Sequence, residues 1–111
     1  MAAGDSAGDL DRPTPLDDLV AYQVGAVVSR TIVKKPTGTV TAFAFDQGEG
    51  LSEHAAAFDA LALVTDGQAE ITVDGAAHLV SAGQLLRLPG GKPHALLALT
   101  RFKMLLVMIR E

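Results

Sequence analysis

The chain has no cysteine and no tryptophan, and aromatic residues make up only 5% of the sequence. The absence of cysteine excludes disulfide bonds, thiolate metal sites and cysteine nucleophiles together. Because aromatic rings are so few, the core of this 111-residue chain must be built mainly from Val, Leu, Ala and Ile. A single domain is the organisation expected at this length.

Two further shortages limit the partners that the chain can have. No run approaches the ~18 to 20 apolar residues of a membrane span, and residues 1–6 contain neither a basic nor a hydrophobic segment. Basic residues are outnumbered, with 9 Lys and Arg against 13 Asp and Glu and a formal net charge of −4. That charge does not favour nucleic acid or an anionic membrane surface. We therefore expect a soluble, cytoplasmic protein that binds neither nucleic acid nor membrane.

The beginning of the chain is expected to differ from the rest. Residues 1–13 are rich in Gly, Ala, Ser and Asp and are expected to form a disordered tail, followed by a single domain over residues 14–111. Thr14 can cap a helix, and Pro15 suits the first helical position. The apolar residues that follow fall on one face, which predicts a short amphipathic helix to about Tyr22.

Beyond this segment the sequence predicts strands. Polar and apolar residues alternate over residues 68–73, so one face of that strand is buried and the other is solvated. The dipeptide Asp66-Gly67 favours a tight turn and is expected to join residues 61–65 and 68–73 as an antiparallel pair. Short strands between closely spaced turns predict an all-β barrel or sandwich. The expected strands cover residues 25–33, 39–45, 61–65, 68–73, 78–80, 84–88, 94–99 and 102–109.

The stretch over residues 83–94 carries the most specific pattern of the chain. Gly83 can open a strand with a positive φ, and Pro89 ends that strand because it cannot donate a ladder hydrogen bond. Gly91 belongs to a sharp reversal, after which His94 enters a second apolar run. His94 should therefore face either the core or a pocket.

The four positions Gly83, Pro89, Gly91 and His94 have the spacing G-x5-P-x-G-x2-H. This stretch resembles the second sequence motif of the cupins, although Ala98 stands where that motif has Asn.

The segment from Gly48 to His54, closed by Gly67, resembles the first cupin motif, G-x5-H-x-H-x3-E-x6-G. The two resemblances imply an RmlC-like cupin: an antiparallel double-stranded β-helix, or jelly-roll barrel, with a short N-terminal helix.

The resemblance also bears on metal binding. Ala56 stands where the first motif has its second histidine and Ala60 where it has glutamate, which implies that two of the four usual ligand positions are replaced. His54 and His94 remain as candidate ligands for Fe, Mn, Ni or Zn. A first-row metal needs three or four protein ligands, so two imidazoles that hydrogen-bond in a polar pocket are favoured over a tight metal site. A site completed by solvent or substrate stays open as the alternative.

The carboxylates nearby do not decide between these alternatives. Asp59 has the opposite strand parity to His54, so only a bulge would turn it inward. The sequence leaves open whether Asp59, Glu53 or Gln84 lines the cavity. His78 is expected to face solvent from a strand with polar neighbours.

The resemblance implies a small-molecule cavity whose polar end carries His54 and His94. Phe43, Phe58 and Met104 are candidates for its walls, with core packing as the alternative role for each. The favoured function is small-molecule binding, and the alternative is a metal-dependent enzyme, dioxygenase-like or isomerase-like, that uses the two histidines with a carboxylate or solvent.

A homodimer is also expected, because small cupins of one domain usually pair. Residues 27–33 are apolar on both faces, which suits a strand covered by a second subunit better than an exposed edge.

Overall fold

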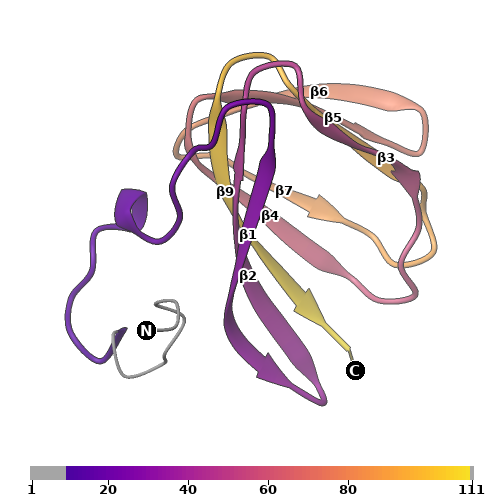
Figure 1. The fold of residues 1–111 in the computed structure, drawn as a ribbon. Coiled ribbons are helices and arrows are strands. Elements are labelled where there is room, and N and C mark those ends of the chain that lie inside the picture. Colours follow the sequence, from indigo (N-terminus) through magenta and orange to yellow (C-terminus); the bar gives the residue numbers. More distant parts are fainter. Residues whose placement is uncertain (1–9, 111) are drawn as a thin grey trace.

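The computed structural model describes residues 10–110, which form two antiparallel sheets that face each other (Figure 1). The five-stranded sheet has the order β1-β2-β9-β4-β7, and the four-stranded sheet has the order β3-β8-β5-β6. This all-β architecture confirms the predicted fold class. The elements are the 3-10 turn η3 (Leu16–Asp18) and the strands β1 (Val27–Lys35), β2 (Gly38–Phe45), β3 (Gly50–His54), β4 (Ala60–Asp66), β5 (Gln68–Val73), β6 (Ala76–Ser81), β7 (Leu85–Leu88), β8 (His94–Ala98) and β9 (Phe102–Ile109).

The predicted disordered tail over residues 1–13 falls mostly on residues 1–9, which lie outside the described residues, as does residue 111. Within residues 10–110, no helix has both the length and the apolar character needed to cross a membrane.

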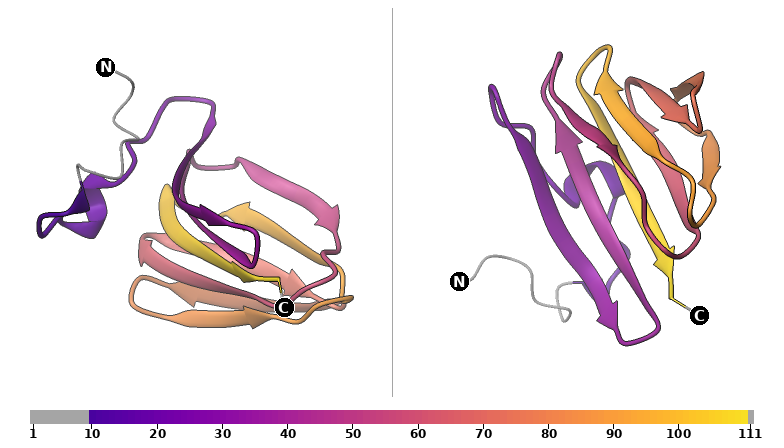
Figure 2. Two further views of the ribbon diagram at one scale, coloured as in Figure 1. Left: turned by 90° about the horizontal axis from the view of Figure 1, so that it is seen from below. Right: turned by 90° about the vertical axis from the view of Figure 1, so that its right-hand side faces the viewer.

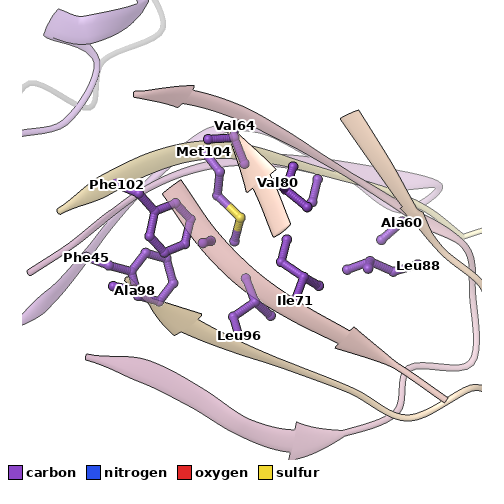
Figure 3. Packing of buried hydrophobic residues seen from close by; sticks show 12 residues of the cluster. Phe45, Ala60, Val64, Ile71, Val80, Leu88, Leu96, Ala98, Phe102 and Met104 are labelled. Atoms are coloured by element: carbon purple, nitrogen blue, oxygen red, sulfur yellow. The ribbon is translucent and has the colours of Figure 1, made fainter. Parts of the chain in front are cut away.

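The core lies between the two sheets and consists largely of small aliphatic side chains, as the shortage of aromatic residues predicted (Figure 3). Its bulk comes from a few large residues. The rings of Phe45 and Phe102 stack with their centroids 4.4 Å apart, and Met104 is only 1% exposed. The alternation predicted for β5 is present, since Ala69 and Ile71 are fully buried while the residue between them is exposed.

The expected pairing of residues 61–65 with residues 68–73 is wrong. The first segment lies in β4, which pairs with β7 and β9, and the second forms β5, which pairs with β6 and β8 in the other sheet. Gly67 therefore connects the two sheets instead of closing a hairpin. It has φ +72°, and the backbone crosses so close to Arg101 that a Cβ at Gly67 would lie 1.8 Å from the Arg101 carbonyl oxygen. Alternation specifies which face of a strand is buried, but not which strand lies beside it.

The expected N-terminal helix is also wrong, because only the single turn η3 forms. The Thr14 hydroxyl donates to the Arg12 carbonyl instead of capping, and Pro15 is extended with ψ 136°. The carbonyl oxygens of Asp17 and Leu19 accept hydrogen bonds from side chains of the five-stranded sheet. A helix this short is marginal in isolation, so contacts with the sheet determine its conformation.

Residues 15–23, which we call the strap, are held on the outside of the five-stranded sheet (Figures 1 and 2). The Lys103 ammonium, on a side chain 7% exposed, donates to the Asp17 carbonyl at 2.6 Å and to its carboxylate at 3.0 Å. The Tyr22 hydroxyl donates to the Asp66 carboxylate at 2.6 Å, and the Lys103 nitrogen lies 4.8 Å from the centre of the Tyr22 ring. Burial and the bond to Asp66 both raise the pKa of Tyr22.

Candidate functional site

His54 and His94 are brought together by neighbouring strands of the four-stranded sheet. They are direct partners in the β3–β8 ladder, as are Leu51 and Leu96. Two residues lie between Leu51 and His54 on β3, but only one lies between His94 and Leu96 on β8, so β3 contains a one-residue bulge between Leu51 and His54. In a regular strand, two residues three positions apart, as Leu51 and His54 are, would lie on opposite faces. The bulge is what puts His54 on the same face as His94.

The two rings contact each other edge to face, with centroids 4.4 Å apart and the Nε2 atoms 3.1 Å apart. The Nδ1 of His54 lies 2.9 Å from the Ser52 carbonyl oxygen, which can only accept, so Nδ1 carries the proton. In the neutral ring, the Nε2 of His54 is then an acceptor, and the Nε2 of His94 must be the donor between them. This assignment leaves the Nδ1 of His94 as a bare lone pair, and that atom is buried without a hydrogen-bond partner.

The environment favours the neutral form of His94, which is 7% exposed. Burial lowers the pKa of His94 below its ordinary value of 6.5, and the neighbouring His54 lowers it further. The Lys92 carbonyl acts in the opposite direction, but it does not complete a hydrogen bond to Nδ1. The geometry therefore fits two neutral imidazoles that share one proton between their Nε2 atoms, with His54 on the solvent side.

Two loops support the histidines from one end of the barrel. The Gly91 amide donates to the Ala56 carbonyl at 2.7 Å, and the Gly90 amide donates to the Asp59 carboxylate, also at 2.7 Å. Their approach is so close that a Cβ at Gly90 would lie 2.7 Å from the Ala57 carbonyl oxygen. The loop after His54 and the loop before His94 are thus fixed to each other, which fixes the ends of β3 and β8.

The polar candidates left open by the sequence lie elsewhere. Asp59 bonds the Gly90 amide, and its second oxygen lies 3.9 Å from the Arg87 guanidinium. Gln84 accepts from the Ser81 amide, and Glu53 is exposed. His78 is exposed on β6, as predicted.

The three apolar candidates for the pocket wall occupy different environments. Met104 is in the core, and Phe43 is partly buried with its ring centroid 5.9 Å from that of Phe45. Phe58 is 42% exposed and lines a hollow that neither histidine borders.

Three of the hollows that described residues line border the outward side of the five-stranded sheet. Their volumes are about 420, 240 and 260 Å³, and neither histidine lines any of them. The first lies beside Phe58 and Arg87, the second beside Val33 and Val107, and the third beside Leu85.

Too few ligand atoms surround the two imidazoles to hold a metal ion tightly. Across residues 10–110, no group of three or more His, Cys, Asp or Glu side chains is placed to hold a metal ion. Two nitrogen ligands alone do not make up the three or four that a tight protein site provides.

Two features of the site were missed by sequence reasoning. The first is β3 itself, whose short sequence has a single half-buried apolar side chain, Leu51, and so gave no alternating pattern. The second is the Ser52 carbonyl, which determines the tautomer of His54. A backbone acceptor has no side-chain signal, so only the fold could reveal it.

Comparison with known proteins agrees with this architecture. The family model of the cupin domain matches residues 42–109. Similar solved structures include a conserved protein of unknown function from Streptococcus pyogenes, at 34% identity and TM-score 0.87, with 90% of this chain and 88% of that one covered. A cupin superfamily protein from Desulfitobacterium hafniense DCB-2 has 31% identity and TM-score 0.87, covering 91% and 93%.

A cupin 2 conserved barrel domain protein from Leptotrichia buccalis is 40% identical with a TM-score of 0.77. The match covers 81% of this chain but only 44% of that chain, so this chain corresponds to less than half of that protein. No curated protein matches the chain.

Proposed function

The chain belongs to the cupin family, and on that premise we propose that it binds a small molecule in the barrel through His54 and His94. The observation that carries the proposal is the convergence of the two Nε2 atoms, which lie 3.1 Å apart on the inward face of the sheet. Burying the imidazole of His94 is costly and contributes little to packing, whereas a few convergent polar groups in an apolar site are typical of ligand binding.

The tautomers suggest which ligand group is preferred. The Nε2 of His94 offers a proton and the Nε2 of His54 offers a lone pair. A hydroxyl group both accepts and donates, so it can replace the bond between the rings without any change in protonation. A carboxylate accepts only, so it would leave the lone pair of the His54 Nε2 without a donor. We therefore favour a neutral ligand with a hydroxyl group, which enters past the exposed ring of His54.

Histidine ¹⁵N resonances test this binding directly. Small alcohols and phenols, each matched to its methyl ether, should shift the Nε2 resonances of both rings, while the ethers should not. His54→Phe should abolish the response, and His78→Ala, which alters an exposed histidine on another strand, should leave it intact. Equal responses to alcohols and ethers would contradict the hydroxyl preference.

One observation favours a second candidate, a metal-dependent cupin enzyme of the dioxygenase or isomerase type. Imidazoles bind a metal at ~2.0–2.1 Å, so two nitrogens 3.1 Å apart can also share one ion. Solvent, substrate or a carboxylate would then have to supply the remaining ligands, because the described residues place no third donor there.

Elemental analysis separates the two candidates. The protein is purified without chelator and without added metal, and well under one ion of Fe, Mn, Ni or Zn per chain is expected. Near-stoichiometric metal that disappears in His54→Ala but remains in His78→Ala would establish the second candidate and reject the first.

A further inference from the structure

Two segments of equal length lead from the histidines to the five-stranded sheet and run beside each other. Residues 55–59 join β3 to β4, and residues 89–93 join β7 to β8. His54 is the last residue of β3 and His94 is the first of β8, so each segment has one histidine at its end. The strands are neighbours at both ends, β3 beside β8 and β4 beside β7. We call residues 55–59 the first crossing and residues 89–93 the second crossing.

Asp59, the last residue of the first crossing, is held by the five-stranded sheet. Its carbonyl oxygen accepts a hydrogen bond from the Ile109 amide at 3.0 Å, at the end of β9. Its carboxylate reaches to the second crossing, where Oδ1 accepts from the Gly90 amide at 2.7 Å. The sheet therefore fixes the backbone of Asp59, and the side chain of Asp59 fixes the second crossing.

The bond to Gly90 is the stronger of these two contacts of the Asp59 carboxylate. An N–H···O⁻ distance of 2.7 Å is typical of a charge-assisted hydrogen bond. The other oxygen lies 3.9 Å from the Arg87 guanidinium, and both side chains are well exposed. An exposed ion pair at that distance contributes little. The bond to the Gly90 amide is therefore the contact through which the carboxylate acts.

The second crossing has little room to shift around this bond. A Cβ at Gly90 would lie 2.7 Å from the Ala57 carbonyl oxygen, so the two backbones are already close there. The next amide, that of Gly91, donates to the Ala56 carbonyl at 2.7 Å. His94 follows three positions after Gly91. A displacement at Gly90 is therefore passed on to His94 through a short stretch of backbone.

We propose that Asp59 is a positioning residue of the candidate site, because its bond to the Gly90 amide sets the separation of the His54 and His94 Nε2 atoms. The inference rests on the proposed function, in which both atoms bind one hydroxyl group. The Nε2 atoms are 3.1 Å apart, and a hydrogen bond weakens steeply as its length and angle depart from the ideal. A binding site of this kind needs its groups held to within about 0.5 Å.

Asp59 acts from outside the site. Its side chain lines the hollow of about 420 Å³ beside Phe58, which neither histidine borders. It therefore affects the ligand through the backbone of the second crossing, without touching it. A carboxylate that only stabilised the loops would lower the free energy of unfolding and leave the two rings as they are. The arrangement of the rings is thus the property that tells the two roles apart.

Histidine ¹⁵N NMR on the full chain measures that arrangement. A scalar coupling between the two Nε2 nuclei across their shared proton persists only while the hydrogen bond is short and straight. The wild type should show this coupling, and Asp59→Ala should lose it. With phenol as the probe, Asp59→Ala should also raise the dissociation constant at least about 3-fold over that of the wild type.

Matched variants separate the hydrogen bond from charge and shape. Asp59→Asn retains a side-chain oxygen for the Gly90 amide and should keep the coupling. Asp59→Leu has nearly the same shape without an acceptor and should behave like Asp59→Ala. Arg87→Met removes the ion pair with Asp59, and Lys92→Met removes a pair of 3.6 Å with Asp74 from the second crossing. Both should keep the coupling.

Circular dichroism identifies the variants that fold. The inference is overturned if the wild type shows no coupling, or if folded Asp59→Ala and Asp59→Leu retain it. Loss of the coupling in Asp59→Asn or in Lys92→Met would overturn it too, because the acceptor at Gly90 would then have no special role. Coupling that depends on Asp59 in a protein that does not bind phenol would support the positioning role and count against the proposed function alone.

Discussion

Replacing Gly67 by alanine should destabilise the fold much more than the same replacement at Gly75. Both glycines have a positive φ, +72° and +84°, so both alanines incur the left-handed penalty of about 1 to 2 kcal/mol. Only Gly67 lies against another segment. Its added Cβ would be 1.8 Å from the Arg101 carbonyl oxygen, whereas no atom lies within 4 Å of a Cβ at Gly75.

The contact at Gly67 cannot be relieved by turning a side chain, because the opposing atom belongs to the backbone. Restoring an ordinary separation of about 3.4 Å requires a backbone shift of well over 1 Å. Gln68, the next residue, is tied to the same segment by its amide, which donates to the Thr100 hydroxyl, and by its carbonyl, which accepts from the Leu99 amide. Losing two such bonds at about 1 kcal/mol each, added to the φ penalty, gives about 3 to 4 kcal/mol.

Urea unfolding followed by circular dichroism measures both variants. The free energy of unfolding should fall by about 3 to 4 kcal/mol for Gly67→Ala and by about 1 to 2 kcal/mol for Gly75→Ala. The difference between them isolates the backbone contact with Arg101. Equal losses in the two variants would refute the argument that this crossing requires a glycine.

Two other outcomes follow from buried polar groups. The lowered pKa of His94 means that the unfolded chain binds more protons below about pH 6.5, so stability should be constant above that pH and fall below it towards the folded pKa. Urea midpoints between pH 8 and 5 should decline less steeply in His94→Leu than in the wild type, and parallel curves would contradict the assignment. Lys103→Met removes the donor to Asp17 and should cost about 1 to 2 kcal/mol. Limited proteolysis should then cut the strap faster, whereas an unchanged cleavage rate would show that Tyr22 and Arg30 suffice to hold it.

The sequence predicted the parts of this fold that depend on local chemistry. Pro89 ends β7 because proline cannot donate a ladder hydrogen bond. The residues of β5 alternate between polar and apolar because one face of that strand packs in the core. The convergence of His54 and His94 followed from the family resemblance, and the structure pairs them directly.

The parts that failed depend on distant segments. No residue close to Gly67 in the sequence indicates that the chain crosses to the other sheet there. The backbone that Gly67 contacts belongs to Arg101, which is distant in the sequence. Residues after Thr14 contain the signals of a helix start, but acceptors that a helix would use are bonded by Lys103 and Arg30.

The apolar side chains on the outward side of the five-stranded sheet were missed for a different reason. In β9, both alternating sets of residues are apolar except for Lys103, so periodicity from Met104 onward cannot say which set faces the core and which faces outward. Met104, a candidate for the pocket wall, belongs to the set that faces the core. The set with Val107 became visible only when the neighbouring strands were aligned with β9.

The bulge in β3 makes the pairing of two strands, and not the residues alone, decide which side chain faces His94. If β3 paired regularly with β8 from Leu51 onward, Glu53 would lie opposite His94 and the His54 ring would turn to the other face. A one-codon deletion between Leu51 and His54 would remove the extra residue and leave a step of two positions on both strands, so the two histidines would remain partners without a bulge. Among relatives of this chain, a segment one residue shorter is therefore compatible with the same histidine pair, whereas a segment of this length requires the bulge.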